Sequence, residues 1–305
     1  MLTIPTALLD TRGRDEEGRS WLASLPALHE RYLAEWDLRP AEGHVEGGIA
    51  SFLQPVRRAD GTRAYLKFQP VDEENIGEAI GLRAWDGRDS VRLLDEDPAT
   101  GVLLLEALDA TRPLSKLADS GAAAEVIGGL LASLTAHKAP EGLRTLADIA
   151  AQMLADVPKT LAAMADEDEK ALLRTCADAV AELVGEPGDR LLHWDLHYDN
   201  VLAPLPGTGR GEWLAIDPKP LAGDPGFDIL PALHNRWSEI TGAGDPAKAL
   251  LRRFDAITGA LAIDRDRAAG WTLGRVLQNS LWTVEDGEDR LEEPQMLIAR
   301  VLLAR

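Results

Sequence analysis

Short apolar runs separated by polar turns fill the first third of the chain, after one leading helix. At residues 17–36 the apolar positions recur at close to helical spacing, which predicts a helix with a kink at Pro26. The runs at residues 51–56 and 64–68 flank a turn at residues 59–61, and this arrangement predicts an antiparallel hairpin.

One helix and two further strands complete this N-terminal region. Residues 72–85 have helical spacing, whereas residues 90–94 and 101–105 return to short apolar runs around the turn at Asp97-Pro98. The pattern therefore predicts a small, mostly antiparallel N-terminal sheet that carries one helix.

Long amphipathic patterns dominate the chain beyond about residue 107. The predicted helices span residues 122–137, 145–165, 167–184, 247–260 and 265–284. Between them, residues 189–228 are rich in Gly, Pro and Asp, which is typical of loops. A chain of 305 residues is longer than one hydrophobic core usually supports. We therefore expect an α+β protein with a sheet-containing lobe at residues 1–107 and a larger, mainly helical lobe at residues 108–305.

Composition narrows the classes of partner. A hydrophobic content of 45% suits a buried core, and no uninterrupted apolar run is long enough to span a membrane. The first ten residues do not look like a secretory signal, and the single cysteine, Cys176, suits core packing in a reducing, cytoplasmic setting. A net charge of −19 argues against nucleic acid or an anionic membrane as partner and favours a cationic small molecule.

The strongest chemical signal is the run His193-Trp194-Asp195-Leu196-His197-Tyr198-Asp199-Asn200, followed by a further carboxylate at Asp217. Phosphoryl transfer needs a group that orients the attacking hydroxyl and oxygen ligands for Mg²⁺. We assign the first role to Asp195 and the second to Asn200 and Asp217. Apolar runs on both sides predict short strands that bracket a polar turn.

Two other interpretations of this run remain open at this stage. Asp195, Asp199 and Asn200 are residue types that form turns readily, so they can be structural. His193, Asp195 and His197 are also metal-ligand types at close spacing, as in a metallohydrolase that binds zinc tightly.

A lysine on a predicted strand is the candidate for binding the nucleotide. Lys67 lies in the run at residues 64–68, and a helix that carries acidic residues follows it, which is the order found in kinases. We expect Lys67 to bind ATP phosphates and to pair with Glu78, with Glu74 as the alternative partner. The glycines within residues 42–51 are a weaker candidate for phosphate contact, and residues 106–109 are expected to form the hinge beside adenine.

Together these motifs resemble the aminoglycoside phosphotransferase family, and specifically its streptomycin 6-phosphotransferase (hydroxyurea phosphotransferase) branch. The variant His-x-Asp-x-His-x-x-Asn at His193 marks the family, and the likeness runs nearly end to end. Its most specific blocks are residues 81–85, 180–190, 192–198, 215–218, 223–228 and 268–273. The resemblance implies a two-lobed protein-kinase-like fold, ATP with Mg²⁺, and phosphorylation of the 6-hydroxyl of streptomycin, which confers antibiotic resistance. It also implies that Asp228 braces the catalytic loop and does not touch substrate.

Streptomycin carries guanidinium groups, for which carboxylates are natural partners. The candidates in the C-terminal lobe are Asp224, Glu285 and Asp286, although acidic residues at a helix end are also common as a solvated cap. Hydroxyurea or an amino sugar remains an alternative acceptor. A non-catalytic nucleotide-binding regulator is the alternative of a different class, but its expected loss of Lys67 or Asp195 is not seen.

Overall fold

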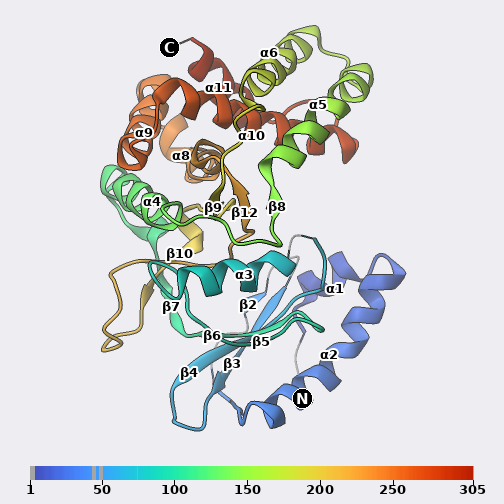
Figure 1. Ribbon diagram of the computed structural model, residues 1–305, viewed down its shortest axis with the longest axis vertical. Coiled ribbons are helices and arrows are strands. Elements are labelled where there is room, and N and C mark those ends of the chain that lie inside the picture. Colours follow the sequence, from blue (N-terminus) through green and yellow to red (C-terminus); the bar gives the residue numbers. More distant parts are fainter. Residues whose placement is uncertain (1–3, 43–45, 48–50, 74, 305) are drawn as a thin grey trace.

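The computed structural model describes residues 4–42, 46–47, 51–73 and 75–304 (Figure 1). Two helices come first, α1 (Thr6–Arg12) and α2 (Glu16–Glu35). The carboxylate of Asp15 caps α2 by accepting a hydrogen bond from the Gly18 N–H at 2.7 Å. The predicted leading helix is therefore present, with α1 as an additional short helix before it.

The N-terminal sheet is antiparallel throughout and has the strand order β1-β3-β4-β6-β5, with β2 also paired to β3. The bounds of these strands are β1 Arg39–Pro40, β2 Glu46–Gly47, β3 Phe52–Arg57, β4 Arg63–Phe68, β5 Leu93–Asp97 and β6 Val102–Glu106. Helix α3 (Ile76–Trp85) connects β4 to β5, and Asp72 accepts a hydrogen bond from the Asn75 N–H just before it. The predicted hairpin and single crossing helix are thus confirmed, with α3 beginning four residues later than the pattern indicated.

The chain changes sheets at Ala107. Strand β7 (Leu108–Pro113) does not continue with β6 but pairs with β10 (Val201–Pro204), which in turn pairs with β11 (Leu214–Ala215). A third sheet joins β8 (Arg144–Thr145), β12 (Leu221–Gly223) and β9 (Arg190–Leu192). The chain thus passes from the first sheet to the second near residue 107, and the division into lobes at this residue stays a prediction.

Helices form the rest of the larger lobe, and α10 lies at its centre (Figure 1). The helices are α4 Ser120–Leu134, α5 Leu146–Ala163, α6 Glu167–Leu183, α7 Leu230–His234, α8 Trp237–Thr241, α9 Pro246–Leu261, α10 Arg265–Glu285 and α11 Glu293–Leu303. Helix α10 packs against α5, α6 and α11 and buries most of its length. The predicted α+β class, with a sheet lobe and a helical lobe, is confirmed.

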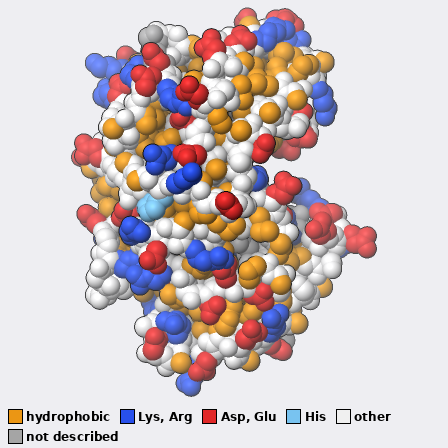
Figure 2. Space-filling model, viewed as in Figure 1, with side chains coloured by type: hydrophobic (Ala, Val, Ile, Leu, Met, Phe, Trp, Pro, Cys, Tyr) orange, Lys and Arg blue, Asp and Glu red, His pale blue; other side chains and the backbone are white. Residues whose placement is uncertain are grey.

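Two hydrophobic clusters stabilise the fold. The boundary between them does not fall at residue 107, where the chain passes from one sheet to the next. The smaller cluster joins α1 and α2 to one face of the N-terminal sheet. The larger one contains the helical lobe and also Leu82 and Trp85 of α3, and the Trp85 indole N–H donates to the Leu134 carbonyl of α4 at 3.1 Å. Helix α3 is therefore anchored in the core of the helical lobe. Figure 2 shows the surface indented at its right edge, between the α5 end of this lobe and the sheet lobe.

None of the helices in the described part of the chain is both long and apolar enough to cross a membrane.

Candidate active site

Lys67 lies at the centre of an ion-pair cluster that spans the two lobes, in which Lys67 and Glu78 are buried and Asp217 is partly exposed. Its Nζ is 2.8 Å from both carboxylate oxygens of Glu78 and 2.6 Å from Oδ1 of Asp217. Burial alone would lower the pKa of Lys67, but the charges of Asp217 and Glu78 outweigh it and raise this pKa above its usual range. Lys67 is therefore a firmly protonated cation. Glu74, the alternative partner, lies outside the described residues, as do residues 43–45 and 48–50 of the glycine-containing segment.

His193 begins the catalytic loop as a neutral, fully buried side chain. Its Nδ1 accepts a hydrogen bond from the Asp195 N–H at 3.4 Å, and Nε2 lies 3.1 Å from the Ile216 carbonyl, to which it donates as N–H. Burial lowers its pKa to about 3. Because the backbone engages both ring nitrogens, His193 has no lone pair to give a metal, which argues against the metallohydrolase interpretation. No group of three or more metal-ligand side chains that could hold an ion occurs among the described residues.

Asp228 holds this loop in place through a hydrogen bond, as the family resemblance implied. It is fully buried, and its Oδ2 accepts a hydrogen bond from the His193 N–H at 2.7 Å. The next residue, Trp194, has a positive φ of 67°, which is unusual for a bulky side chain. The loop is thus held in a strained conformation by a buried carboxylate, a feature that is common at functional sites.

Asn200 is tied back to Asp195 at the other end of the loop. Its Nδ2 donates to the Asp195 carbonyl at 3.0 Å and lies 3.5 Å from Asp195 Oδ2. This places the amide nitrogen toward Asp195 and leaves the amide oxygen free to serve as a ligand. Burial raises the pKa of Asp195, and the charge of His197 opposes this effect.

Asp217 faces Lys67 from the segment after β11. The Ile216 N–H donates to the Asn200 carbonyl at 2.9 Å, so the two predicted metal ligands come from segments that are hydrogen bonded to each other. Burial would raise the pKa of Asp217, but the charges of Lys67 and Lys219 lower it well below its usual range. The Asn200 amide and the Asp217 carboxylate are hard oxygen donors, and two such groups suit Mg²⁺, which takes its remaining ligands from phosphates and water.

The structure gives Asp224 contacts that do not favour the predicted substrate role. Its Oδ1 accepts the Gly226 N–H at 2.8 Å, and its Oδ2 lies 2.6 Å from Arg267 Nε. The side chain is almost fully buried, so both oxygens are engaged in stabilising the turn at Pro225–Asp228. Asp286 is exposed at the C-terminal cap of α10.

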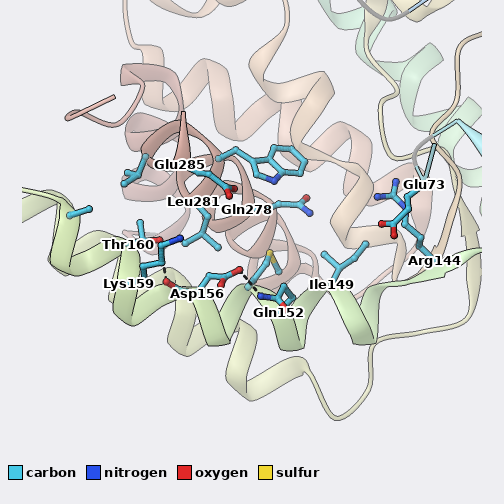
Figure 3. Close-up of a pocket in the computed structure, with 14 residues that line it drawn as sticks. Glu73, Arg144, Ile149, Gln152, Asp156, Lys159, Thr160, Gln278, Leu281 and Glu285 are labelled. Atoms are coloured by element: carbon cyan, nitrogen blue, oxygen red, sulfur yellow. Dashed lines mark hydrogen bonds between the residues drawn. The ribbon is translucent and has the colours of Figure 1, made fainter. Parts of the chain in front are cut away.

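Glu285, in contrast, lines a cavity of about 490 Å³ between α5 and α10 (Figure 3). The cavity is lined by Glu73, Arg144, Ile149, Gln152, Met153, Asp156, Lys159, Thr160, Ala163, Gln278, Leu281, Trp282, Val284 and Glu285. Figure 3 shows Asp156 of α5 across from α10, and this carboxylate was not found from the sequence because its helix carries many similar polar residues. The lining carries three carboxylates and two cationic side chains, those of Arg144 and Lys159, so one negative charge is left in excess, which favours a cationic group.

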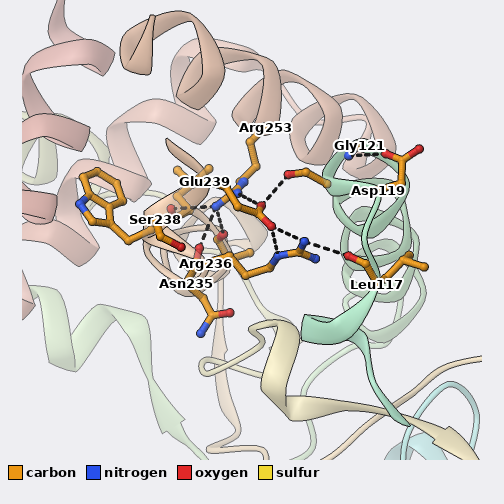
Figure 4. A network of polar contacts seen from close by, with 12 residues as sticks. Leu117, Asp119, Gly121, Asn235, Arg236, Ser238, Glu239 and Arg253 are labelled. Atoms are coloured by element: carbon orange, nitrogen blue, oxygen red, sulfur yellow. Dashed lines mark hydrogen bonds and ion pairs between the residues drawn. The ribbon is translucent and has the colours of Figure 1, made fainter. Parts of the chain in front are cut away.

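A second cavity, of about 450 Å³, opens beside Asp195 and is lined by His197, Leu230, Pro231, His234, Asn235, Arg236, Trp237, Arg275 and Asn279. A network of hydrogen bonds and ion pairs around Glu239 holds the side of this cavity that contains Arg236 in place (Figure 4). Glu239 accepts hydrogen bonds from Arg236 Nε at 2.7 Å, Arg253 Nη2 at 3.1 Å and Ser120 Oγ at 2.8 Å. Asn235 donates to Asp199 at 2.9 Å, which connects this side of the cavity to the catalytic loop.

The two cavities lie on either side of a stack of aromatic and guanidinium groups that was not predicted from the sequence. The Trp194 ring lies between Arg144, 4.6 Å from its centroid, and Arg275, 4.5 Å from it. Trp282 packs edge-on against Trp194, with 6.0 Å between the ring centroids.

The expected hinge carries an ion pair of its own. Glu106 of this segment pairs with Arg210 at 2.5 Å.

The chain is similar to known kinases in sequence and in fold. The family model described as "Aminoglycoside/hydroxyurea antibiotic resistance kinase" matches residues 35–287. The chain is 52% identical over 298 residues to a streptomycin 6-kinase of Streptomyces glaucescens, covering 98% of this chain and 95% of that one. It is also 52% identical over 309 residues to a hydroxyurea phosphotransferase of Kitasatospora aureofaciens, covering 100% and 87%.

Solved structures share the fold at low identity. The aminoglycoside phosphotransferase APH(4)-Ia superposes with a TM-score of 0.61 at 14% identity, over 92% of this chain and 99% of that one. A ternary complex of its thermostable mutant with AMP-PNP and hygromycin B gives a TM-score of 0.59 at 15% identity, over 90% and 98%.

Proposed function

The chain belongs to the aminoglycoside/hydroxyurea antibiotic resistance kinase family, and from that premise we propose that it transfers the γ-phosphoryl group of ATP to the 6-hydroxyl of streptomycin. The observation that carries this proposal is the 2.6 Å contact between Lys67 and Asp217, beside the loop that holds Asp195 and Asn200. These four side chains have the chemistry that phosphoryl transfer requires.

Each of these residues has a separate task in the proposed reaction. Lys67, kept in place by Glu78, would bind phosphate oxygens. Asn200 and Asp217 would hold Mg²⁺, which supplies charge neutralisation on the phosphates when it is bound. Asp195 would orient the acceptor hydroxyl and take its proton, and the raised pKa of its carboxyl suits a group that must accept a proton near neutral pH.

The cavity between α5 and α10 supports a guanidinium-bearing acceptor. Glu285, Asp156 and Glu73 present carboxylates on its lining, and carboxylates bind guanidinium groups through paired hydrogen bonds. The relative from Streptomyces glaucescens is named for streptomycin. We therefore assign this cavity to a guanidinium group of the acceptor, while the reacting hydroxyl lies beside Asp195.

The cavity beside Asp195 favours a second candidate, a small neutral acceptor such as hydroxyurea. Apart from Asp195 its charged or titratable lining residues are Arg236, Arg275, His197 and His234, which do not attract a cation. The relative from Kitasatospora aureofaciens is named for hydroxyurea. An amino sugar remains a further acceptor to test. Because the proposed reaction consumes ATP, we propose that it takes place in the cytoplasm.

A direct assay decides among these acceptors. The purified protein is incubated with ATP, Mg²⁺ and streptomycin, and the antibiotic is followed by mass spectrometry for the gain of one phosphoryl group, with Asp195→Asn as the control. Phosphorus-proton correlation NMR then identifies the modified hydroxyl. A gain with the wild type alone, at the 6-hydroxyl, supports the proposal. Unmodified streptomycin together with phosphorylated hydroxyurea would replace it with the second candidate.

A further inference from the structure

Lys219 is attached to both segments that carry the proposed catalytic groups. It follows Asp217 by two residues, and Asp217 has a left-handed backbone with φ 54°, so the chain turns sharply between them. The Lys219 N–H then donates to the His193 carbonyl at 3.0 Å. The lysine is therefore fixed to the first residue of the loop that presents Asp195.

The ammonium group of Lys219 is held by a neutral partner. Its Nζ lies 3.3 Å from Oδ1 of Asn75, at the upper end of hydrogen-bond distances. Asn75 is itself buried and fixed, because its N–H and its Nδ2 donate to the two carboxylate oxygens of Asp72 at 2.9 and 2.8 Å. Within the described ranges Lys219 forms no salt bridge, in contrast to Lys67.

The surroundings of Lys219 are nevertheless acidic. Burial raises the pKa values of Asp195 and Glu78, and the positive charge of Lys219 opposes this rise; the same charge helps to lower the pKa of Asp217. Glu78 and Asp217 share one paired cation, Lys67, so these two carboxylates carry one negative charge more than Lys67 offsets before a nucleotide binds. A terminal phosphoryl group would add more, and a second cation beside it would offset that charge.

The loop that carries Lys219 is also packed too tightly to move away. Helix α3 lies against Pro220, the next residue, and a Cβ added at Gly81 would come within 2.5 Å of the Pro220 ring. At Gly77 an added Cβ would lie 3.2 Å from the Pro220 carbonyl oxygen. The glycines let the helix approach closely, and this contact keeps Lys219 beside Asn75 and the N-terminus of α3.

We propose that Lys219 is a further catalytic residue, whose ammonium group donates hydrogen bonds to the γ-phosphoryl oxygens as they accumulate charge during transfer. This inference rests on the proposed function. The bond between the γ-phosphorus of ATP and the oxygen that bridges it to the β-phosphorus breaks, and a bond from the γ-phosphorus to the acceptor oxygen forms. The acceptor proton passes to Asp195, ADP keeps the electron pair of the broken bond, and Lys219 stays protonated throughout. A weak hydrogen bond to an amide is exchanged for a stronger one to an anion.

The test separates contact with the γ-phosphoryl group from a purely structural role. Binding of AMP-PNP and of ADP, each with Mg²⁺, is measured by calorimetry for the wild type, Lys219→Met and Lys219→Arg. Lys138→Met provides a matched control, since this lysine is largely exposed and remote in sequence from the site. Removal of a donor to the transferring group lowers kcat by roughly 10² to 10³-fold. In Lys219→Met we expect this loss of kcat for both phosphoryl transfer and ATP hydrolysis. Lys219→Arg should recover part of the lost kcat, and Lys138→Met should keep the kcat of the wild type.

Nucleotide binding gives the readout that does not depend on turnover. We expect Lys219→Met to bind AMP-PNP about tenfold more weakly, which corresponds to the loss of one charge-assisted hydrogen bond, and to bind ADP as the wild type does. Equal weakening of both nucleotides, or a kcat within threefold of the wild type, would overturn the proposal. Asn75→Ala is the second variant: if it reproduces the full loss of Lys219→Met, Lys219 acts only as a structural link to α3.

A failure of the proposed function gives a different result. If the wild type hydrolyses ATP but phosphorylates none of the acceptors, the assignment of the acceptor is wrong, and the hydrolysis and binding data still decide the role of Lys219. If the wild type binds neither nucleotide, both proposals are wrong.

Discussion

The replacement Asp228→Asn should change how stability depends on pH. Burial raises the pKa of Asp228 to about 7, although the hydrogen bond from His193 opposes this rise. In the unfolded chain an aspartate titrates near 3.9, so between these two values the folded state holds a proton that the unfolded state has lost. The contribution of Asp228 to stability is therefore fully present below about pH 4 and is lost as the pH rises to 7.

The expected size follows from the shift, which is about three pH units. Each unit corresponds to about 1.4 kcal/mol, so the ionisation of Asp228 costs on the order of 4 kcal/mol above pH 7. An asparagine amide oxygen can still accept the His193 N–H but has no charge to desolvate. From pH 5.5 to 8.5 the variant should therefore gain about 2 kcal/mol relative to the wild type.

Urea denaturation followed by tryptophan fluorescence, at half-unit steps from pH 5.5 to 8.5, measures this difference. Asp178→Asn makes the same substitution at an exposed position on α6 and serves as the control. Stability profiles of the wild type and Asp228→Asn that stay parallel over the whole range would refute the reasoning, because they would mean that Asp228 is ionised in the folded protein at every pH tested.

Four further predictions concern the site and its supports. Asp195→Asn should lower kcat by roughly 10² to 10⁴-fold while ADP binding by calorimetry is unchanged, and the wild-type rate should fall with decreasing pH through the raised pKa of Asp195. Lys67→Met should weaken ATP binding about tenfold or more, since a buried phosphate ligand is lost and its carboxylate partners are left unpaired. Glu285→Gln should raise the KM for streptomycin about tenfold with little change in kcat, as expected for a group that binds the acceptor equally before and during transfer. Arg267→Met should lower the free energy of unfolding by about 2 kcal/mol, because it leaves buried Asp224 without its cation, and an altered KM for streptomycin in this variant would instead point to a substrate role for Asp224.

The arrangement of the catalytic loop could be predicted because it is encoded locally. Asp195 and Asn200 lie five residues apart in one polar turn between apolar runs, and their hydrogen bond closes within that turn. The pairing of Lys67 with Glu78 also follows from local order, since a strand that leads directly into a helix limits which carboxylate can reach the lysine.

The acceptor side could not be predicted, because its contacts join residues that are distant in the sequence. Asp224 follows the loop that carries Asp217 and looked like a free carboxylate, but its partner Arg267 lies 43 residues further on. The stack of Arg144, Trp194 and Arg275 depends on how β8, the catalytic loop and α10 pack together. Periodicity identifies a helix face but not the face of another element that it meets.

The contact of α3 with Pro220 has a consequence for control of the enzyme. In protein kinases the corresponding lysine-glutamate pair must be assembled when the helix that carries the glutamate moves into place, and this movement is the regulatory step. Here Gly77 and Gly81 bring the helix into contact with Pro220, in the loop after Asp217, and Trp85 binds its other end to α4. We do not expect a helix that is held at both ends in this way to move to a separate inactive position. We therefore expect an enzyme that is always switched on, in which the amount of protein made and the arrival of its acceptor set the rate.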